Sequence, residues 1–257
     1  MVEFSKFNKI AKLSRSKPSA REKISMPELF TKNNFAEKIE LPKDLSFESK
    51  PLYEVLWRRR SHRYYKDEPI SIADLSKLLY FSLGVSAFTS AYFYEKYPLR
   101  MYPTAGALNP IETYVSVQNV EGLNRGIYVY LYNDHSLGLL KKGDFSKKLW
   151  KACIEQDHVR DAAVNIILVA KVNRTYWKYG ERAYRYVHLD CGHASQNVLL
   201  VATSLDLGSC VVGAFFDDEI CEVLGIDCEW EIPMEVITIG KISKIERDYK
   251  RVNTLEL

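Results

Sequence analysis

The apolar and polar positions of the chain are most strongly patterned between Tyr184 and Gly208. From Val198 to Ala202 the residues are apolar on every face, so a helix here cannot be a surface helix with one apolar stripe. We expect it to lie inside the molecule or between two copies, and to end at Gly208 in the left-handed conformation. Polar side chains gather near its start instead: His188, Asp190, His193, Gln196 and Asn197. This end of the helix is expected to form the floor of a pocket.

From residue 52 onwards, helical and strand periods follow one another. The pattern predicts helices over 52–60, 71–83, 144–156 and 217–225 and strands over 111–120, 164–172, 209–216 and 235–240, with a hairpin of 126–132 and 136–140. Ser71 with Asp74 resembles a capping box, and Asp144 and Asp217 are expected to cap the two later helices. Residues 85–103 have no regular period and are rich in Tyr, Phe and Ser, so we expect a mobile aromatic loop over a site.

The first fifty residues differ from the rest of the chain. Pro18, Pro27 and Pro42 interrupt a stretch of little periodicity, which predicts an N-terminal arm over 1–50 that packs on something already folded. The remaining residues, 51–257, are expected to form one α+β domain around a single large core.

Composition places the chain among ordinary globular proteins. Apolar residues make up 47% and charged residues 27% of its 257 residues, and no run approaches the ~20 apolar residues of a membrane span. The net charge of +3 is too small to indicate nucleic acid, and much of the positive excess lies in the arm. The five cysteines are odd in number and form no CxxC pair, so neither a zinc site nor a disulfide framework is indicated. With no secretory signal, a reducing cytoplasm is expected.

The densest group of anion-binding side chains is RRRSHRYY, Arg58–Tyr65. Arginine presents a rigid fork of donors that matches a phosphate, and Ser61 adds a hydroxyl beside it. The alternative is a solvated basic turn, since charge runs usually face water. Neither GxGxxG nor GxxxxGK[ST] occurs, so a Rossmann nicotinamide site and an ATP site are not indicated. His188, Asp190 and His193 match no metal-ligand spacing, and no metal site is expected.

Several motifs resemble, in the same order, those of the FMN-dependent nitroreductase family. They are Arg59-x-Ser61-x-Arg63 before an aromatic pair, YPTAGALNP before a strand, GHxxQN in the buried helix and GSCVVGAF near the end. More narrowly, RRSHRYY, NVEGLNRGIYVY and KYGERAYRYVHLDCGHASQN resemble the SagB-type branch, the azoline dehydrogenases. The similarity covers about Leu52 to Gly240. It implies an α+β nitroreductase-like fold, with a central, mostly antiparallel sheet flanked by helices and a buried central helix at a dimer interface.

The resemblance implies FMN as the cofactor. It assigns cofactor binding to Arg59, Ser61, Arg63, Thr104, Ala105, Gly106, Ala107, Asn109, Gly213 and Ala214. In the family the first motif holds the phosphate and ring edge, the middle small residues lie along the isoalloxazine, and the last pair brings backbone amides to the ring. Thr104 stands where serine is commoner, which keeps the hydroxyl but tightens the space. Gln196 joins this set because an amide at the polar end of the helix can reach a pocket.

Lys178 and Tyr179 resemble a Lys-Tyr pair that SagB-type oxidases carry ahead of the buried helix. A lysine near a cationic, partly dry flavin site has its pKa lowered and can act as a base. The alternative is a solvated lysine on a surface loop. Because of the resemblance, we expect Lys178 and Tyr179 to be the catalytic pair.

The expected function is that of an FMN-dependent oxidoreductase that oxidises azolines to azoles in ribosomally made peptides. The partners expected are a second copy of the chain, a peptide substrate and a cyclodehydratase complex, but neither nucleic acid nor membrane. One alternative is a general NAD(P)H-dependent nitro or quinone reductase. The other is a flavin-binding subunit of a peptide-modifying assembly that contributes no turnover.

Overall fold

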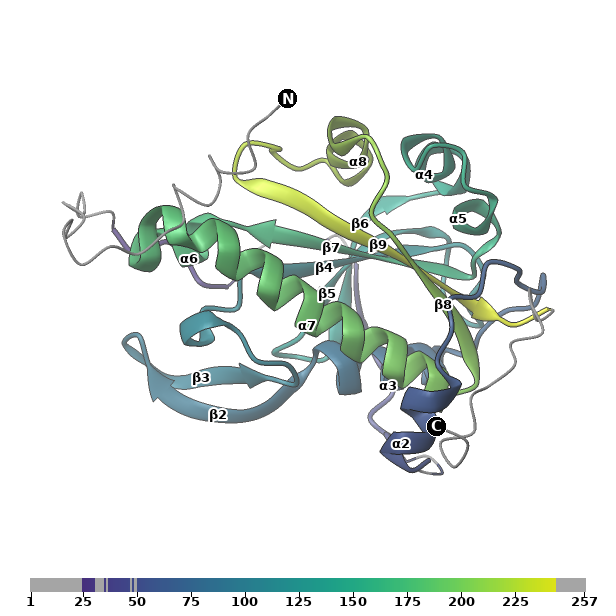
Figure 1. Cartoon of the computed structure of the whole chain (residues 1–257), viewed down its shortest axis with the longest axis horizontal. Helices are drawn as coiled ribbons and strands as arrows, with labels where there is room; N and C mark the ends of the chain where they lie inside the picture. The colour runs from purple at the N-terminus through teal and green to yellow at the C-terminus, as the bar shows by residue number, and fades with distance from the viewer. Residues whose placement is uncertain (1–24, 31–34, 36, 47, 49, 244–257) are drawn as a thin grey trace, which may run out of the picture.

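The computed structural model describes residues 25–30, 35, 37–46, 48 and 50–243, which form a seven-stranded sheet with helices on both faces (Figure 1). In spatial order the strands are β1 (Lys38–Glu40), β6 (Ser136–Lys142), β5 (Gly126–Leu131), β4 (Ile111–Val117), β7 (Val164–Lys171), β9 (Glu231–Lys241) and β8 (Leu207–Val212). All six neighbouring pairs in this order are antiparallel. The predicted α+β class and antiparallel sheet are confirmed.

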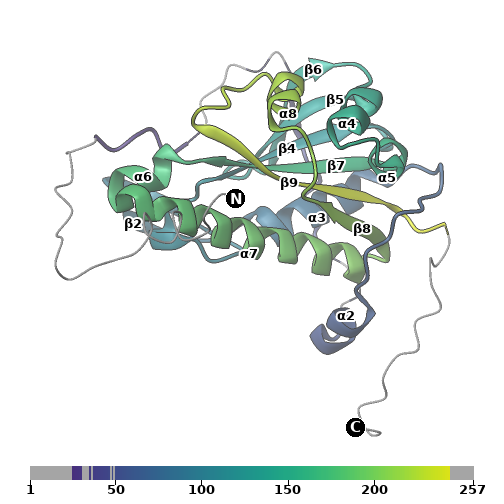
Figure 2. The same ribbon diagram turned by 45° about the horizontal axis from the view of Figure 1, so that its top comes forward.

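Two apolar layers fill the space between the sheet and its helices. The helices α3 (Ile72–Leu83) and α7 (Ala183–Ser204) cover one face, and α4 (Ser146–Ala152), α5 (Asp157–Asp161) and α8 (Asp217–Leu224) cover the other, as both views show (Figures 1 and 2). In β7, Ile166 and Leu168 belong to the first layer, and Ile167 and Val169 belong to the second. A strand that is buried on both faces reads as an unbroken apolar run, which explains why the pattern of residues 164–172 predicts a strand correctly.

Among the residues that the structure describes, the long helix α7 is fully covered on the side that faces the sheet. Val198 and Ala202 are fully buried against the sheet, whereas the three residues between them, 199–201, are only half-buried. Beside the end of α7 lies the short helix α2 (Leu52–Arg58), shown in Figure 2, whose Tyr53 and Trp57 are 77% and 53% exposed. The helix is thus buried towards the sheet, while the described residues leave its other apolar side half-buried; the expected position between two copies stays a prediction.

Residues 85–103 are an ordered hairpin, so the expectation of a mobile aromatic loop is wrong. Strand β2 (Val85–Ala91) pairs with β3 (Tyr94–Arg100) with two register shifts, and these irregularities obscure the alternation along the sequence. The aromatic side chains pack inward as well as outward, since Tyr97 is fully buried. A second element without a strong pattern, α6 (Asn173–Tyr179), continues through η2 (Gly180–Arg182) into α7.

Helix ends differ from the prediction in three places. Asp206, with a φ of 58°, takes the left-handed position after α7, and the expected stop at Gly208 is wrong because this glycine lies inside β8. The predicted helix 144–156 is the shorter α4, which ends at Ala152, and α5 follows beyond the predicted range; the Asp144 carboxylate accepts the Ser146 amide at 2.8 Å at the start of α4. Helix α8 begins at Asp217 after Phe216, and the Asp217 side chain provides no cap. The Ser71–Asp74 cap of α3 is confirmed.

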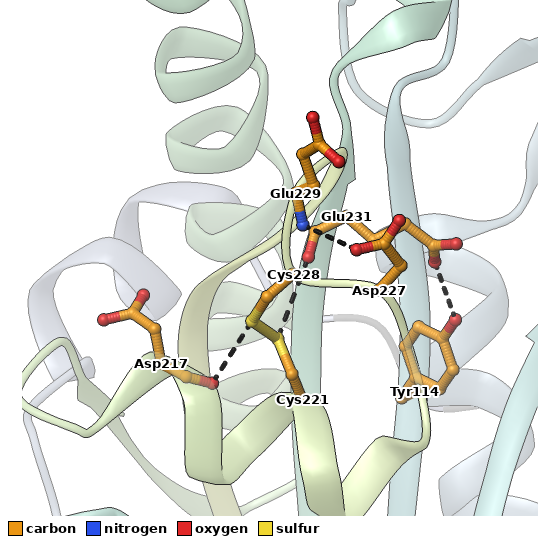
Figure 3. Close-up of a disulfide and its surroundings, with 7 residues drawn as sticks. All are labelled: Tyr114, Asp217, Cys221, Asp227, Cys228, Glu229 and Glu231. Carbon is orange, nitrogen blue, oxygen red and sulfur yellow. Dashed lines mark hydrogen bonds between the residues drawn. A yellow bond between two sulfur atoms is a disulfide. The ribbon is translucent and has the colours of Figure 1, made fainter.

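Cys221 and Cys228 form a disulfide that joins α8 to the loop before β9 (Figure 3). The sequence-based expectation of no disulfide is wrong, because the chain returns to the end of the helix within a sequence separation of seven. The other three cysteines, Cys153, Cys191 and Cys210, are buried thiols. Within the described ranges, no helix combines the length and apolarity needed to cross a bilayer.

Candidate active site

After Arg58, the last residue of α2, residues 59–65 run in extended form beside the start of β8. The His62 amide donates to the Ser209 carbonyl at 2.9 Å, and Ser61 forms a parallel bridge with Ser209. This close approach requires a glycine, since a Cβ on Gly208 would lie 3.0 Å from the Cβ of His62. Alternate residues of an extended segment face opposite sides, so Ser61, next to His62, faces away from the glycine, whereas the Tyr65 ring packs against it.

The three predicted anion-binding residues alternate along this segment: Arg59, Ser61 and Arg63. Arg59 and Ser61 are half-buried and Arg63 is exposed. The two arginines between and before them have other partners. Arg58 pairs with carboxylates at 2.8 and 3.2 Å, and Arg60 donates to backbone carbonyls at 2.6 and 3.1 Å. Arg58 and Arg60 thus hold the local fold, and anion binding by Arg59, Ser61 and Arg63 stays a prediction.

The small-residue motif forms a tight turn near the other end of α7. Gly106 and Ala107 have φ values of 61° and 57°, and Asn109 follows at 49°. Side chains hold the backbone of the turn in place. The Tyr97 hydroxyl donates to the Ala107 carbonyl at 2.6 Å, and Thr104 Oγ1 accepts the Asn109 amide at 3.3 Å. Asn109 is buried and structural, whereas Gly106 is exposed at the outer edge of the turn.

Lys178 and Tyr179 lie directly over this turn, so the structure brings the predicted catalytic pair to the predicted flavin-facing residues. A Cβ built on Gly106 would collide with the Tyr179 hydroxyl and lie 3.1 Å from Lys178 Nζ. Lys178 Nζ donates to the Tyr92 hydroxyl at 2.7 Å. Tyr92 lies at the tip of the β2–β3 hairpin, and the sequence pattern missed it because that stretch has no regular period.

The pKa of Lys178 is raised, and the expectation that it is lowered is wrong. The hydrogen bond to Tyr92 is the largest cause, and it outweighs the desolvation that lowers the pKa. The predicted lowering assumed a neighbouring arginine cation, but the described surroundings of Lys178 that act on it are Tyr92 and Tyr179. Lys178 is therefore a cation in this arrangement at neutral pH.

The buried Asp190 of α7 holds the backbone of the Gly106 turn. It is 3% exposed, and its two carboxylate oxygens accept the Ala105 amide at 3.0 and 3.1 Å. Burial raises its pKa to about 6, although the Ala105 hydrogen bond and the charge of His193 act in the opposite direction. His193 itself is exposed, with Nδ1 at 3.3 Å from the Pro103 carbonyl oxygen. Among the described residues no group of three or more His, Cys, Asp or Glu side chains is placed to hold a metal.

A buried ion pair fixes α6 and hence Lys178. Arg174, 1% exposed, pairs with Glu112 of β4 and donates to the Asn109 carbonyl at 3.2 Å. Losing either partner would leave an uncompensated charge in the core, so the pair strongly determines where α6 lies. The sequence carries one signal for it, an arginine close to three aromatic residues in 173–179, which hydrophobic periodicity alone does not reveal.

The remaining predicted residues are distributed along α7 and β8. Gln196 is exposed on α7, and Asn197 donates to the Met101 carbonyl at 3.1 Å, so Asn197 is structural. Gly213 and Ala214 are exposed just beyond β8, and a Cβ on Gly213 would meet no heavy atom within 4 Å. These two residues leave backbone accessible to a ligand.

In one copy the two halves of the predicted site do not meet. Asp190 touches the Gly106 turn, whereas the end of α7 at Ser204 lies beside α2 and the arginine segment. The helix rises about 21 Å between Asp190 and Ser204. Arg59, Ser61 and Arg63 are therefore separated from Lys178 and Tyr179 by most of the length of α7.

A polar cavity of about 430 Å³ lies elsewhere, near the Tyr65 end of the arginine segment. Arg125 and Arg160 in its wall pair with Asp144 at 3.0 Å and Asp161 at 2.9 Å. Its charges are thus matched within the wall, and none of the predicted cofactor or catalytic residues lines it.

Residues 56–241 match the nitroreductase family. Over 208 residues the chain is 37% identical to MJ1384 of Methanocaldococcus jannaschii, which is named as a candidate nitroreductase; the match covers 81% of this chain and 97% of that protein. A candidate nitroreductase from Desulfovibrio desulfuricans, solved in complex with FMN, has the same fold, with a TM-score of 0.53 and 19% identity over 82% of this chain and 96% of that one.

The chain is also similar to proteins of peptide modification. It is 27% identical over 149 residues to the microcin B17-processing protein McbC of Escherichia coli, covering 56% of this chain and 55% of McbC. The chain thus spans about half the length of McbC. The E. coli microcin synthetase McbBCD complex, solved with truncated pro-MccB17 bound, contains a chain of this fold, with a TM-score of 0.61 and 21% identity over 93% of this chain and 87% of that one.

Proposed function

Because the chain belongs to the nitroreductase family, whose members are usually FMN-dependent oxidoreductases, we propose that it is an FMN-dependent dehydrogenase of azoline rings in a ribosomally made peptide. The observation that carries the proposal is the position of Lys178 and Tyr179 directly over the Gly106 turn. A hydride acceptor alone suits many reductases, but proton-transferring groups beside it suit a reaction that removes a hydride and a proton together. The similarity to McbC supports this choice of substrate class.

The chemistry of the donors fits FMN. Arg59, Ser61 and Arg63 offer two guanidiniums and a hydroxyl on one side of an extended segment, which suits a terminal phosphate. Gly213 lies four residues beyond Ser209 along β8, a separation of about 13 Å that an elongated ligand with a phosphate at one end can bridge. The exposed backbone there would face the ring system.

A second copy of the chain completes the site in this proposal. The exposed apolar side of α7 and the exposed side chains of α2 need cover, and a two-fold axis across α7 would bring the arginine segment of one copy to the Gly106 turn of the other. We therefore propose a homodimer with FMN at its interface, so that each site draws on both chains.

When bound, FMN supplies the hydride acceptor. The ring proton that leaves with the hydride must pass to the protein, and Lys178 with Tyr179 is the group placed to receive it. Lys178 is charged in the resting arrangement, so it accepts a proton only after losing one. The rate of azoline oxidation should consequently rise with pH, since a raised pKa keeps the neutral amine scarce at neutral pH.

The two alternative functions would require different residues. A general NAD(P)H-dependent nitro or quinone reductase needs the flavin site but no base over the substrate. A flavin-binding subunit without turnover needs the flavin site as well, but no catalytic group. Only the azoline dehydrogenase requires Lys178 and Tyr179 for its reaction. We propose for it, in addition, a peptide substrate, association with a cyclodehydratase complex and a cytoplasmic location.

The deciding experiment compares Lys178→Ala and Tyr179→Phe with Arg59→Ala. The first two should stay yellow and dimeric while azoline-driven flavin reduction slows roughly 100-fold or more, the usual scale for a general base. Arg59→Ala should instead weaken FMN binding by roughly 1.5 to 3 kcal/mol, the scale of a hydrogen bond to a charged group. If both pair variants reduce flavin at the parent rate with an azoline peptide, the general reductase takes the place of this proposal.

A further inference from the structure

We propose that Tyr92 is a positioning residue for Lys178, which it holds in a fixed place and in its charged form over the Gly106 turn. The proposal rests on the role assigned above to Lys178. The Tyr92 hydroxyl accepts a hydrogen bond from Lys178 Nζ at 2.7 Å and donates one to the Gly106 carbonyl oxygen. The lysine nitrogen also lies 4.9 Å from the centroid of the Tyr92 ring. One side chain thus joins the hairpin, α6 and the turn.

The direction of these hydrogen bonds decides which form of Lys178 is favoured. A phenol hydroxyl carries one proton, and here that proton is directed at Gly106, so only lone pairs face the lysine. An ammonium fills this position with a charge-assisted bond, which is stronger than the bond that a neutral amine would donate. Tyr92, from the hairpin, and Tyr179, from α6 itself, are the titratable side chains that act on Lys178 among the described residues, and both raise its pKa.

The hairpin is anchored so that its tip stays in place. At the end of β3, Arg100 donates two hydrogen bonds to the Leu83 carbonyl, at 2.9 and 2.6 Å, and is 6% exposed. Near the tip, the Tyr92 ring packs edge-on against Tyr97 and Trp177, with centroids 5.2 and 6.0 Å apart. Tyr92 has a φ of 51°, a conformation that a non-glycine residue keeps only where its surroundings fix it. Both ends of the hairpin therefore support the position of the hydroxyl.

It follows that Tyr92 sets the pH at which Lys178 becomes a base. Without the hydroxyl, the ammonium loses its strongest partner and the neutral amine becomes more populated at any given pH. A purely structural Tyr92 would act through its ring alone, and removal of the hydroxyl would then leave Lys178 unchanged.

The test compares Tyr92→Phe with Tyr94→Phe in the full-length chain. Each substitution removes one hydroxyl from the same hairpin and keeps the ring, and the Tyr94 ring contacts Phe30 and Tyr97 rather than Lys178. Acetic anhydride reacts only with neutral amines, so the labelling of Lys178 is followed by peptide mass spectrometry from about pH 7 to about 11, the range in which lysine titrates. Lys96 of the same hairpin serves as the internal reference.

We expect Lys178 in Tyr92→Phe to be labelled about threefold faster or more than in the parent below its pKa, with no change in Tyr94→Phe. The azoline-dependent pH–rate profile of Tyr92→Phe should move to lower pH in parallel. Equal labelling of Lys178 in Tyr92→Phe and the parent overturns the proposal. Labelling needs neither flavin nor substrate, so it is independent of the proposed function, which fails instead if Lys178→Ala oxidises azolines normally.

Discussion

Gly106 is the residue at which backbone conformation and site geometry coincide. Its φ of 61° disfavours any side chain, and the space outside it is taken by Lys178 and Tyr179. Gly122 provides a matched control, because its φ of 74° imposes the same backbone strain with no heavy atom within 4 Å of a Cβ.

We predict that Gly106→Ala and Gly122→Ala each lose about 1 to 2 kcal/mol of unfolding free energy, the cost of a left-handed non-glycine residue. The Gly106 neighbours are the ends of flexible side chains, which yield by moving rather than by unfolding the protein. Only Gly106→Ala should therefore lose azoline oxidation. Urea titrations and rates on the two variants check this, and equal activity in both would contradict the position assigned to the Lys-Tyr pair.

Asp190 gives a prediction with a defined pH dependence. Its folded pKa of about 6 lies above the ordinary value of 3.8, so the folded state binds more protons between these values and loses stability as pH rises through them. Asp190→Asn keeps an oxygen for the Ala105 amide but removes the buried charge. At pH 7.5 it should be more stable than the parent by about 2 to 3 kcal/mol, and the gain should shrink towards about pH 4. Thermal unfolding at both pH values measures the difference; a gain independent of pH would contradict the assignment to this carboxylate.

At the scale of helices and strands, the disulfide between α8 and the β9 loop makes a short covalent ring. Next to the disulfide, the Trp230 carbonyl accepts a hydrogen bond from the Val172 amide at 3.0 Å. The Trp230 ring packs on the Tyr176 ring of α6, with centroids 5.7 Å apart. The segment directly after the disulfide thus supports the start of α6.

We predict that Cys228→Ser lowers the unfolding free energy by about 2 to 3 kcal/mol, as expected for closure of a loop of this length. A dithiol reductant should bring the parent down to the same value and leave Cys228→Ser unaffected. Urea titrations with and without reductant test both statements. A parent whose stability does not respond to complete reduction would show that the cross-link contributes nothing.

Elements whose burial is uniform could be predicted from the sequence, and elements built on irregular contacts could not. The central strands could be predicted from their apolar runs, and α3 could be predicted from its helical period and the Ser71 cap. The hairpin β2–β3 does not, because two register shifts break its alternation. The same physics explains the site: Lys178, Tyr179 and the small residues could be found from motifs, but Tyr92 reaches them only through the fold of that hairpin. Nor could the Lys178 pKa be predicted before its partner was known.

At the scale of the whole molecule, the arrangement of exposed apolar residues is asymmetric. Tyr53 and Trp57 are exposed aromatic residues of α2, which contacts α7, whereas Ile154 is an exposed apolar residue in the α4–α5 connection over the other face of the sheet. Trp57 and Ile154 are 53% and 52% exposed, which makes them a matched pair.

We predict that Trp57→Glu converts the dimer into monomer at micromolar concentration and releases its flavin, while Ile154→Glu does neither. A carboxylate placed in an apolar interface must be desolvated, which costs more than the single contact it replaces. Sedimentation velocity followed at the flavin absorbance reports both properties at once. A monomeric parent that keeps FMN at low concentration would refute the dimeric site.

The separation of the arginine segment from the Lys-Tyr pair along α7 has a genetic consequence. If each site takes Arg59 from one copy and Lys178 from the other, two inactive proteins can repair one another. A mixed dimer of Arg59→Ala and Lys178→Ala carries one site with both defects and one site with none. Random reassortment of equal amounts should thus restore about a quarter of the parental sites, because half of the dimers are mixed and each has one intact site. Co-expression of the two single variants should then restore activity. Co-expression of either single variant with the double variant should give no active site.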